Sequence, residues 1–341
     1  MQNIGLKDIA EIVDVSVTSV SKVLNGYPIR ISNSKRTNII ETAERLGYKP
    51  NMVARGLKSR KTKSVGIVIP DMSTLFYPEL LMALETWLSA RGYQTFICNS
   101  EDDLEKEKSR IDALMSRSID GLIVAPAAGD GNIPLFKQIQ ESRAPFLLLD
   151  RYYAGEGLNY IVTDNKSGAI LGVNVLASMG ASKLVYLGGS VRNQSLQDRL
   201  EGVYEGAARS SLHFDDAGVF LARPDRASIK ATADRIFESC NEGAGVFLES
   251  NRYLMGLLDA AGERSLKIPN DLLVAGFDSF RPNITSAGDF AALGVIRRPI
   301  PIIKQDTEKM AELACEYLIS GLVGGKNQNL QMMLPVQVIN G

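Results

Sequence analysis

The start of the chain alternates apolar and polar residues with the period of short amphipathic helices. Apolar positions recur at helical spacing over residues 6–13, again over residues 20–24, and again over residues 32–46 before Gly47. Ser16 stands at the N-cap of the second helix, so the first residues of that helix are polar or small and face outward. Two helices this short cannot bury a core alone, but a third helix closes one. The pattern predicts an all-α headpiece that begins with a helix-turn-helix.

From residue 64 the pattern changes to apolar runs of strand length separated by amphipathic stretches. The predicted strands are residues 65–69, 94–98, 121–125, 145–149, 183–187, 218–221, 245–248 and 272–276. The predicted helices are residues 78–91, 104–117, 134–142, 167–179, 197–210, 228–240 and 252–262. Strands without alternation are buried on both faces, which indicates parallel sheets covered by helices. Two such units in series predict a bilobed α/β body with a ligand cleft between the lobes, at the carboxyl ends of the strands.

The charge is unevenly distributed between the two parts of the chain. The net charge of the chain is −1, and residues 1–63 hold twelve Lys and Arg against five Asp and Glu, a net charge of +7. The remainder therefore carries −8. A basic headpiece on an acidic body is typical of a nucleic-acid-binding protein, because the phosphates attract the headpiece and repel the body.

The chain does not have the residue types of catalytic and metal sites at the spacings that such sites require. The chain has one histidine, His213, and three widely separated cysteines without metal or redox spacing. Gly188 and Gly189 lack the third glycine of a dinucleotide-binding loop, and no nucleophile has a base in reach. We therefore expect no catalytic residue, no metal and no cofactor. Without a signal peptide or an apolar run of membrane-spanning length, we expect a cytoplasmic protein with no membrane partner.

An ordered set of short motifs carries a specific resemblance. They are Leu-Lys-Asp-Ile-Ala at 6–10, Ser-Val-Ser-Lys-Val-Leu-Asn at 19–25, Leu-Gly-Tyr-Lys-Pro-Asn at 46–51 and Ala-Arg-Gly-Leu at 54–57. This run resembles the lactose/galactose repressor family of transcription factors, and the match continues through nearly the full length. The resemblance implies a DNA-binding regulator, with a body like the periplasmic sugar-binding proteins. A sugar-binding protein without a DNA function, which the body alone would support, is disfavoured by the basic headpiece.

The position of each headpiece residue predicts its contact with DNA. Val17 and Thr18 at the start of the second helix, and Lys22 one turn later, face the major groove. Val17 offers apolar contact to a thymine methyl group, and Lys22 suits guanine. Residues expected to bind phosphates, which position the protein without reading sequence, are Ser16, Asn25, Ser32 and Asn33.

Residues 51–59 match the hinge helix of the family, which lies in the minor groove with a leucine wedged between base steps. The matching positions are Asn51, Ala54, Arg55 and Leu57, with Leu57 as the wedge. The segment is short and Gly56 lowers its helix propensity, so we expect it to fold only on DNA.

The resemblance also divides the chain into domains. It implies a headpiece at 1–49, a hinge helix and linker at 50–63, a first lobe at 64–162 and 294–324, and a second lobe at 163–293 and 325–341. The chain would cross between lobes near residues 161–163, 292–295 and 324–329. Residues 301–322 would then form a helix of the first lobe, and residues 332–339 a late strand of the second.

Polar residues at strand ends supply the expected cleft. Carboxylates, an arginine fork, an amide and an aromatic face are the groups that a polyhydroxylated ligand needs. The resemblance assigns four of them to pocket positions of sugar-responsive members: Asp150, Arg199, Asn251 and Asp278. Phe76 and Tyr77 match a loop that closes over the ligand.

Two arginines depart from the pattern of the family. Arg252 stands where many members have an acid, and Arg151 follows Asp150 directly. The pair Asp150-Arg151 and the sequence Glu-Arg-Ser-Leu-Lys-Ile-Pro at 263–269 resemble the fructose-repressor and catabolite repressor/activator branch of the family. The added charge favours a sugar phosphate or sugar acid over a neutral sugar as the effector. A purine-type effector is the alternative if Phe76 and Tyr77 stack on its ring. If Arg151 only pairs with Asp150, its charge says nothing about the charge of the effector.

Assembly follows from the kind of DNA site. Operators of this family are near-palindromes because two headpieces bind per dimer, and the body supplies the dimer contact along helices of the first lobe. No heptad repeat of a C-terminal tetramerising coil is present. We predict a homodimer that represses a carbohydrate-utilisation operon.

Overall fold

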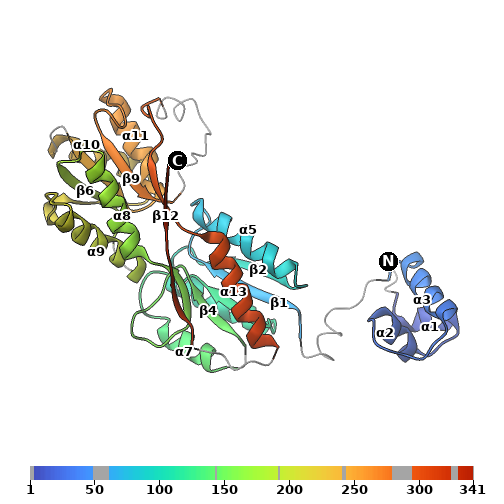
Figure 1. The fold of residues 1–341 in the computed structure, drawn as a ribbon. Helices are drawn as coiled ribbons and strands as arrows, with labels where there is room; N and C mark the ends of the chain where they lie inside the picture. Colours follow the sequence, from blue (N-terminus) through green and yellow to red (C-terminus); the bar gives the residue numbers. More distant parts are fainter. Residues whose placement is uncertain are drawn as a thin grey trace. The chain divides into compact units, whose positions relative to one another are not determined.

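The computed structural model describes residues 4–48, 61–142, 144–190, 193–239, 243–278, 294–323 and 329–340. The chain divides into two compact units, one that ends at Thr62 and one that begins at Lys63 (Figure 1). We call the first unit the headpiece and the second the body, and treat each by itself. Residues 49–60, which include the expected hinge helix at 51–59, lie outside the described ranges, so that helix stays a prediction.

The headpiece is the predicted three-helix unit. Its helices are α1 (Leu6–Val13), α2 (Val17–Leu24) and α3 (Asn33–Arg45). One apolar residue of each helix, Ile9, Val20 and Ile39, is completely buried in a shared core. Ser16 caps α2, because its hydroxyl accepts the backbone N–H of Ser19 at 3.1 Å. The prediction of a helix-turn-helix followed by a third helix is confirmed.

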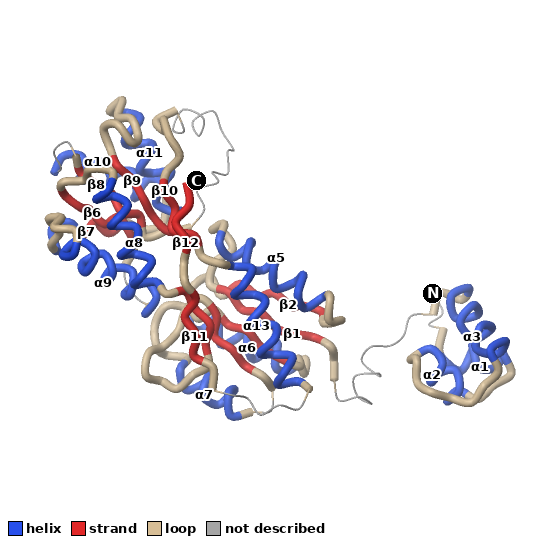
Figure 2. The backbone as a smooth tube through the Cα atoms, in the orientation of Figure 1, coloured by secondary structure: helices blue, strands red, loops and turns tan. Residues whose placement is uncertain are grey.

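The first lobe of the body is built on a six-stranded sheet in the order β11-β5-β4-β3-β1-β2. Its strands are β1 (Ser64–Ile69), β2 (Gln94–Asn99), β3 (Gly121–Val124), β4 (Phe146–Leu149), β5 (Tyr160–Thr163) and β11 (Gln331–Leu334), all parallel. Helices α5 (Phe76–Ser89) and α13 (Thr307–Leu322) share one buried cluster with the sheet. Helices α6 (Leu104–Ser116) and α7 (Ile133–Glu141) share the other, so both faces are covered (Figure 2).

The second lobe repeats the scheme with the order β12-β10-β9-β8-β6-β7. Its strands are β6 (Lys183–Gly188), β7 (Val219–Leu221), β8 (Ala244–Leu248), β9 (Leu273–Phe277), β10 (Pro301–Lys304) and β12 (Gln337–Asn340). All run parallel except β12, which is antiparallel to β10. Helices α8 (Asn165–Ser178) and α9 (Gln194–Arg209) cover one face, and α10 (Arg226–Ser239) and α11 (Leu254–Glu263) cover the other. The short 3-10 helices are η1 (Asp216–Gly218) and η2 (Asn251–Tyr253).

Two predictions about the crossings between lobes are wrong. Residues 301–304 are not helical: they form β10 of the second sheet, because this apolar run is buried there, and α13 starts only after its N-cap Asp306. Residues 332–339 are not one strand. They are divided at Pro335, which has no N–H for a sheet ladder, into β11 of the first sheet and β12 of the second.

These assignments move the borders of the lobes. Val295 packs in the second lobe, so residues 294–304 belong to that lobe and not to the first. The crossings therefore lie after β5, at residues 305–306 and at residues 335–336. The prediction of two doubly wound, largely parallel sheets in a bilobed body is confirmed.

Candidate functional site

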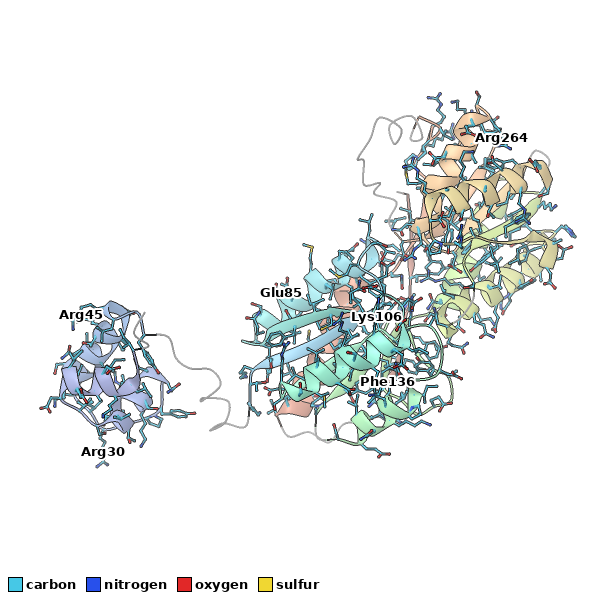
Figure 3. All side chains as sticks on the ribbon, turned by 180° about the vertical axis from the view of Figure 1, so that it is seen from behind. Arg30, Arg45, Glu85, Lys106, Phe136 and Arg264 are labelled. Carbon is cyan, nitrogen blue, oxygen red and sulfur yellow. The ribbon has the colours of Figure 1, made fainter. Side chains whose placement is uncertain are left out.

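The first candidate site is the exposed face of α2 in the headpiece. Val20 and Val23 turn into the core, while Val17 is 43% exposed and Thr18 and Lys22 are exposed as well. The three side chains predicted to read bases therefore share the solvent face of one capped helix. Side chains also project outward elsewhere on the headpiece, among them Arg30 and Arg45 (Figure 3).

The predicted phosphate contacts of the headpiece have local structural roles too. Ser32 caps α3 by accepting the N–H of Lys35 at 3.3 Å. Asn25 donates from its amide nitrogen to the carbonyl oxygen of Ser21 at 2.7 Å. The candidates Asn51, Ala54, Arg55 and Leu57 lie outside the described residues.

The second candidate site is a cavity of about 480 Å³ in the body. Its walls come from segments that follow the carboxyl ends of strands in both sheets, as the sequence predicted. The volume is in the range of small-molecule sites. The polar and aromatic lining residues include Phe76, Tyr77, Asp102, Asp150, Arg151, Ser195, Arg199, Glu249, Ser250, Arg252, Tyr253, Asp278 and Gln305.

Asp150 lies at the centre of the first-lobe wall. It follows β4 with a left-handed backbone (φ 67°), and its carboxylate accepts the hydroxyl of Tyr77 at 2.6 Å. Burial raises the pKa of Asp150, although Arg151, Tyr77 and Arg199 act in the opposite direction. Phe76 and Tyr77 do not form a loop over the ligand: they are the first residues of α5, buried in an edge-to-face contact of 5.2 Å between ring centroids.

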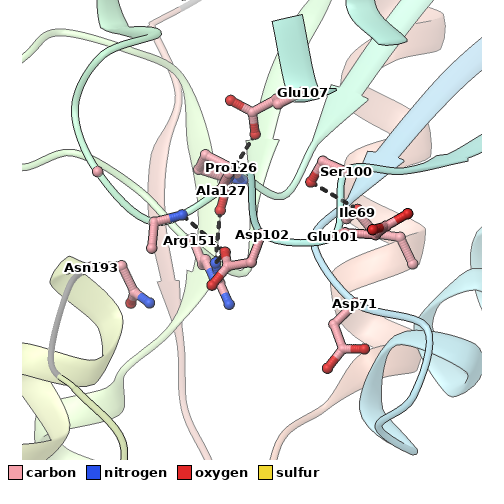
Figure 4. A network of polar contacts seen from close by, with 12 residues as sticks. Ile69, Asp71, Ser100, Glu101, Asp102, Glu107, Pro126, Ala127, Arg151 and Asn193 are labelled. Carbon is pink, nitrogen blue, oxygen red and sulfur yellow. Dashed lines mark hydrogen bonds and ion pairs between the residues drawn. The ribbon is translucent and has the colours of Figure 1, made fainter. Parts of the chain in front are cut away.

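Arg151 is held by its own lobe rather than by Asp150. Its guanidinium donates to Asp102 at 2.6 Å and to the carbonyl oxygen of Pro126 at 3.0 Å (Figure 4). The same Asp102 oxygen accepts the N–H of Ala128 at 2.9 Å. Burial acts to lower the pKa of Arg151, but the neighbouring acidic groups raise it on balance. Arg151 is therefore a charged residue whose charge is already paired.

Arg199 lies at the centre of the second-lobe wall. It is 5% exposed and donates to the side-chain oxygen of Asn165 and to the backbone oxygen of Glu249, both at 2.7 Å. Its guanidinium stacks on Phe277 at 3.8 Å from the ring centroid. These contacts leave Arg199 fixed, with its charge directed among the carboxyl groups of the cleft.

Asp278 connects the cleft to a crossing segment. It follows β9 with a left-handed backbone (φ 70°) and accepts the side-chain amide of Gln305 at 2.6 Å. The oxygen of that amide accepts the hydroxyl of Thr163, at the end of β5, at 2.5 Å. Burial raises the pKa of Asp278. Gln305 and Thr163 lie at two of the three crossings. These hydrogen bonds therefore connect Asp278, in the wall of the cavity, to the segments that join the lobes.

Polar contacts between described residues join the lobes across the cleft. Ser195 of α9 donates to the backbone oxygen of Asp150 at 2.8 Å, and Tyr152 donates to Asp198 at 2.8 Å. Arg252 forms an ion pair with Asp71 of the first lobe. The second of the unusual arginines thus also has a carboxylate partner, which weakens the charge argument for an anionic effector.

Comparison with known proteins establishes the family. Residues 65–326, more than half of the chain, match the periplasmic binding protein domain. Residues 5–51 match the model described as bacterial regulatory proteins, lacI family. The chain belongs to the lacI family. This lacI-family protein is a DNA-binding transcriptional regulator and not an enzyme.

Individual relatives match this chain over most of their own length. The ribose operon repressor of Halalkalibacterium halodurans is 29% identical over 80% of both chains. The transcriptional repressor PurR of Aliivibrio salmonicida is 24% identical over 92% of this chain and 91% of its own. A crystal structure of the lac repressor dimer, bound to operator and the anti-inducer ONPF, shares the fold with a TM-score of 0.84 at 19% identity, over 99% of this chain and 98% of that one.

The lining of the lacI-family cleft differs in part from the residues that the sequence assigned to it. Asn251 lies in η2, partly buried, and the cavity is lined instead by its neighbours Ser250 and Arg252. Glu249 and Gln305 line the cavity, and both directly follow a strand. The position after a strand end was therefore the signal for both. Gln305 was missed because residues 301–304 were assigned to a helix.

Two general classes of feature do not occur in the described part of this lacI-family chain. Within those residues, no helix is long and apolar enough to cross a membrane. Nor do three or more His, Cys, Asp or Glu residues gather there in a way that could hold a metal ion.

Proposed function

We propose that this protein is a repressor of a carbohydrate-utilisation operon, and that a small carbohydrate-like effector in the cleft controls it allosterically. The observation that carries the proposal is the buried group of Asp150, Arg199 and Asp278, which line one cavity at the junction of the lobes. Carboxylates and a guanidinium at fixed positions suit a ligand with many hydroxyl groups. The similarity to a ribose operon repressor supports a sugar.

The headpiece contributes the sequence-reading surface in this proposal. Val17, Thr18 and Lys22 enter the major groove, while Ser16, Asn25 and Ser32 contact phosphates. The hinge candidates Asn51, Ala54, Arg55 and Leu57 lie in the minor groove at the centre of the operator. The capped, outward-facing start of α2 supports this assignment.

A homodimer on a near-palindromic operator completes the proposal. The edge strand β2 exposes Phe96 by 39% and Ile97 by 43%, and the neighbouring helix α5 exposes Met82 by 72%. Apolar side chains gathered along a sheet edge are typical of an interaction surface. We expect Ile97→Asp to give monomers by analytical ultracentrifugation, whereas Leu171→Asp on α8 of the second lobe leaves the dimer intact. A dimeric Ile97→Asp variant would contradict this interface.

Selection of binding sites from random duplex DNA tests the DNA-binding part. The purified full chain should enrich a near-palindrome, because two identical headpieces bind two half-sites. Enrichment of single, non-repeated sites would contradict the dimer, and no enrichment would contradict sequence-specific binding.

Thermal unfolding of the full chain with neutral sugars, sugar acids, sugar phosphates and purines tests the effector part. A ligand at a hundred times its dissociation constant adds about 2.7 kcal/mol to stability. Purines represent a second candidate, a purine-responsive regulator, which the aromatic Phe76 in the cavity wall and the similarity to PurR favour. If only purines stabilise the protein, the proposed effector is a purine and not a carbohydrate.

A further inference from the structure

The charges around the cavity are not all available to a ligand. Among the described residues, four arginines line it, and three of them have an acidic partner other than Asp150, Glu249 and Asp278. Arg151 is bonded to Asp102, Arg252 is paired with Asp71, and Arg223 lies 3.6 Å from Asp225 on the exposed rim. In the described part of the cleft, Arg199 is the lining arginine without an ion pair, although Arg151 and Arg252 also act electrostatically on Asp150 and Glu249.

Three buried carboxyl groups in the described part of the cavity wall interact electrostatically with Arg199. Asp150, Glu249 and Asp278 are 8%, 3% and 9% exposed, and all three line the cavity. Among the residues that the structure describes, the side chains that donate to them are uncharged: Tyr77 donates to Asp150, Tyr186 to Glu249 and Gln305 to Asp278. Arg199 directs its own N–H groups to Asn165 and to a backbone oxygen. Within the described residues, the group of Asp150, Glu249, Asp278 and Arg199 thus has more hydrogen-bond acceptors than donors and more acidic than basic side chains.

Glu249 is the carboxyl group whose position is most fully built. Its two oxygens accept the hydroxyl of Tyr186 at 2.7 Å and the backbone N–H of Gly189 at 3.2 Å. A Cβ at Gly188 would lie 2.6 Å from the ring of Tyr186 and 2.7 Å from Glu249, so the glycine makes room for this pair. Burial raises the pKa of Glu249 from its ordinary range. The protein therefore holds Glu249 in a fixed orientation at the cavity wall, although desolvation of a buried carboxyl group is unfavourable for folding.

We propose that the cleft takes an uncharged ligand rich in hydroxyl donors and rejects its phosphorylated and acidic analogues, with Glu249 as the residue that sets this selectivity. A hydroxyl group donates to the free electron pairs of the carboxylate, whereas an anion would add negative charge to a desolvated group that already has too few cations. The inference rests on the proposed function and narrows its effector class. It reverses the expectation that the extra arginines favour an anion.

Matched ligand pairs test the inference on the full chain. The pairs are ribose with ribose 5-phosphate, fructose with fructose 1-phosphate, glucose with glucose 6-phosphate, and galactose with galacturonate, each measured by thermal shift and then by calorimetry. In every pair that binds, we expect the neutral member to bind at least about a hundredfold more tightly. A phosphate or acid that binds as well as its neutral partner, or better, overturns the inference.

Substitution at Glu249 separates its role from that of the cleft as a whole. Glu249→Gln keeps the shape and removes the charge, so neutral ligands should bind about tenfold more weakly while the penalty on anionic analogues shrinks. Glu238→Gln, the same change at an exposed position of α10, should alter neither value. An unchanged ratio between neutral and anionic ligands in Glu249→Gln would remove Glu249 from the proposal.

Tyr186→Phe tests the positioning of the carboxylate. Tyr186 lies in β6, and its hydroxyl acts to lower the pKa of Glu249, as do Gly189, Arg199 and Arg252. Without that hydroxyl, Glu249 should take up a proton at higher pH, so the loss of neutral-ligand affinity on acidification should begin at higher pH than in the wild type. A pH profile identical to that of the wild type contradicts the positioning role.

The outcomes distinguish the inference from the function on which it rests. Binding of anionic sugars contradicts the inference and leaves a carbohydrate-responsive regulator. If no sugar of any pair binds while operator binding is intact, the proposal of a carbohydrate effector is contradicted, and the inference with it.

Discussion

The two candidate sites differ in what holds their side chains. On α2, Val17, Thr18 and Lys22 are exposed, and the side-chain hydrogen bonds at the two ends of the helix join residues three or four positions apart. In the cleft, Asp150, Arg199 and Asp278 are buried, and their partners are up to 73 residues away in sequence. The α2 site is formed by exposed side chains on the headpiece, whereas the cleft residues are part of the buried packing of the body.

This difference predicts how each site responds to substitution. Removing an exposed side chain from α2 changes what the headpiece binds without changing its core. Removing a buried polar group from the cleft leaves its partners unsatisfied, so stability and ligand binding change together. The following substitutions test that contrast in order of expected effect.

Arg199→Ala should have the largest effect. It leaves three buried carboxyl groups without their central cation, so we expect a loss of about 3–5 kcal/mol in unfolding free energy of the body, measured by urea denaturation. Arg209→Ala on the same helix, where the side chain is 63% exposed and pairs with Glu205, should cost less than about 1 kcal/mol. Equal losses in the two variants would show that the cleft is not a packed polar network.

Lys22→Ala should act on DNA alone. If Lys22 contacts a guanine, operator binding weakens by about 1–3 kcal/mol and the preference at one base position of each half-site relaxes. Because the side chain is exposed, the melting temperature should not change. Fluorescence anisotropy with selected operator and calorimetric melting measure the two quantities, and an unchanged base preference would assign Lys22 to the phosphates.

Ser16→Ala should destabilise the headpiece by about 1 kcal/mol, because the N–H of Ser19 loses its cap. Thr37→Ala, at an exposed position within α3, is the control and should change stability by no more than about 0.5 kcal/mol. Hydrogen exchange of amides in α2 reports the difference. Equal protection of α2 in wild type and Ser16→Ala would rule out the capping role.

Glu249→Gln should give the smallest effect in the absence of ligand, visible as a dependence on pH. Burial raises the pKa of Glu249 in the folded state from its ordinary value of 4.5. The stabilisation from its bound proton is complete below that value and is lost as the pH rises through the folded-state pKa. The variant should therefore be the more stable protein near pH 8, and this advantage should shrink as the pH falls toward about 4.5. Urea unfolding at several pH values measures it, and a constant difference would contradict the raised pKa.

The sequence was sufficient for features that depend on near neighbours. The caps at Ser16 and Ser32 and the apolar spacing of the headpiece are local, so its three helices were predicted correctly. Most strands of the body were also predicted, since long apolar runs mark strands buried on both faces. Asp150, Arg199 and Asp278 lie together as expected because strand ends meet at the cleft.

Features that depend on distant partners could not be predicted. The charge of Arg151 suggested an anionic ligand until the structure paired it with Asp102, which is 49 residues away. Arg252 similarly pairs with Asp71 from the other lobe. The assignment of residues 301–304 failed because a proline followed by apolar residues fits the start of a strand as well as the start of a helix.

The central claim is that the cleft and the operator surface are coupled. Operator affinity of the full chain, measured by anisotropy with and without a saturating neutral ligand found in the pairwise screen, tests it most directly. We expect a change of about tenfold or more, in either direction, and a smaller change in Asp278→Asn because the bond to Gln305 at the crossing is altered. An operator affinity that stays the same while calorimetry shows the ligand bound would contradict it.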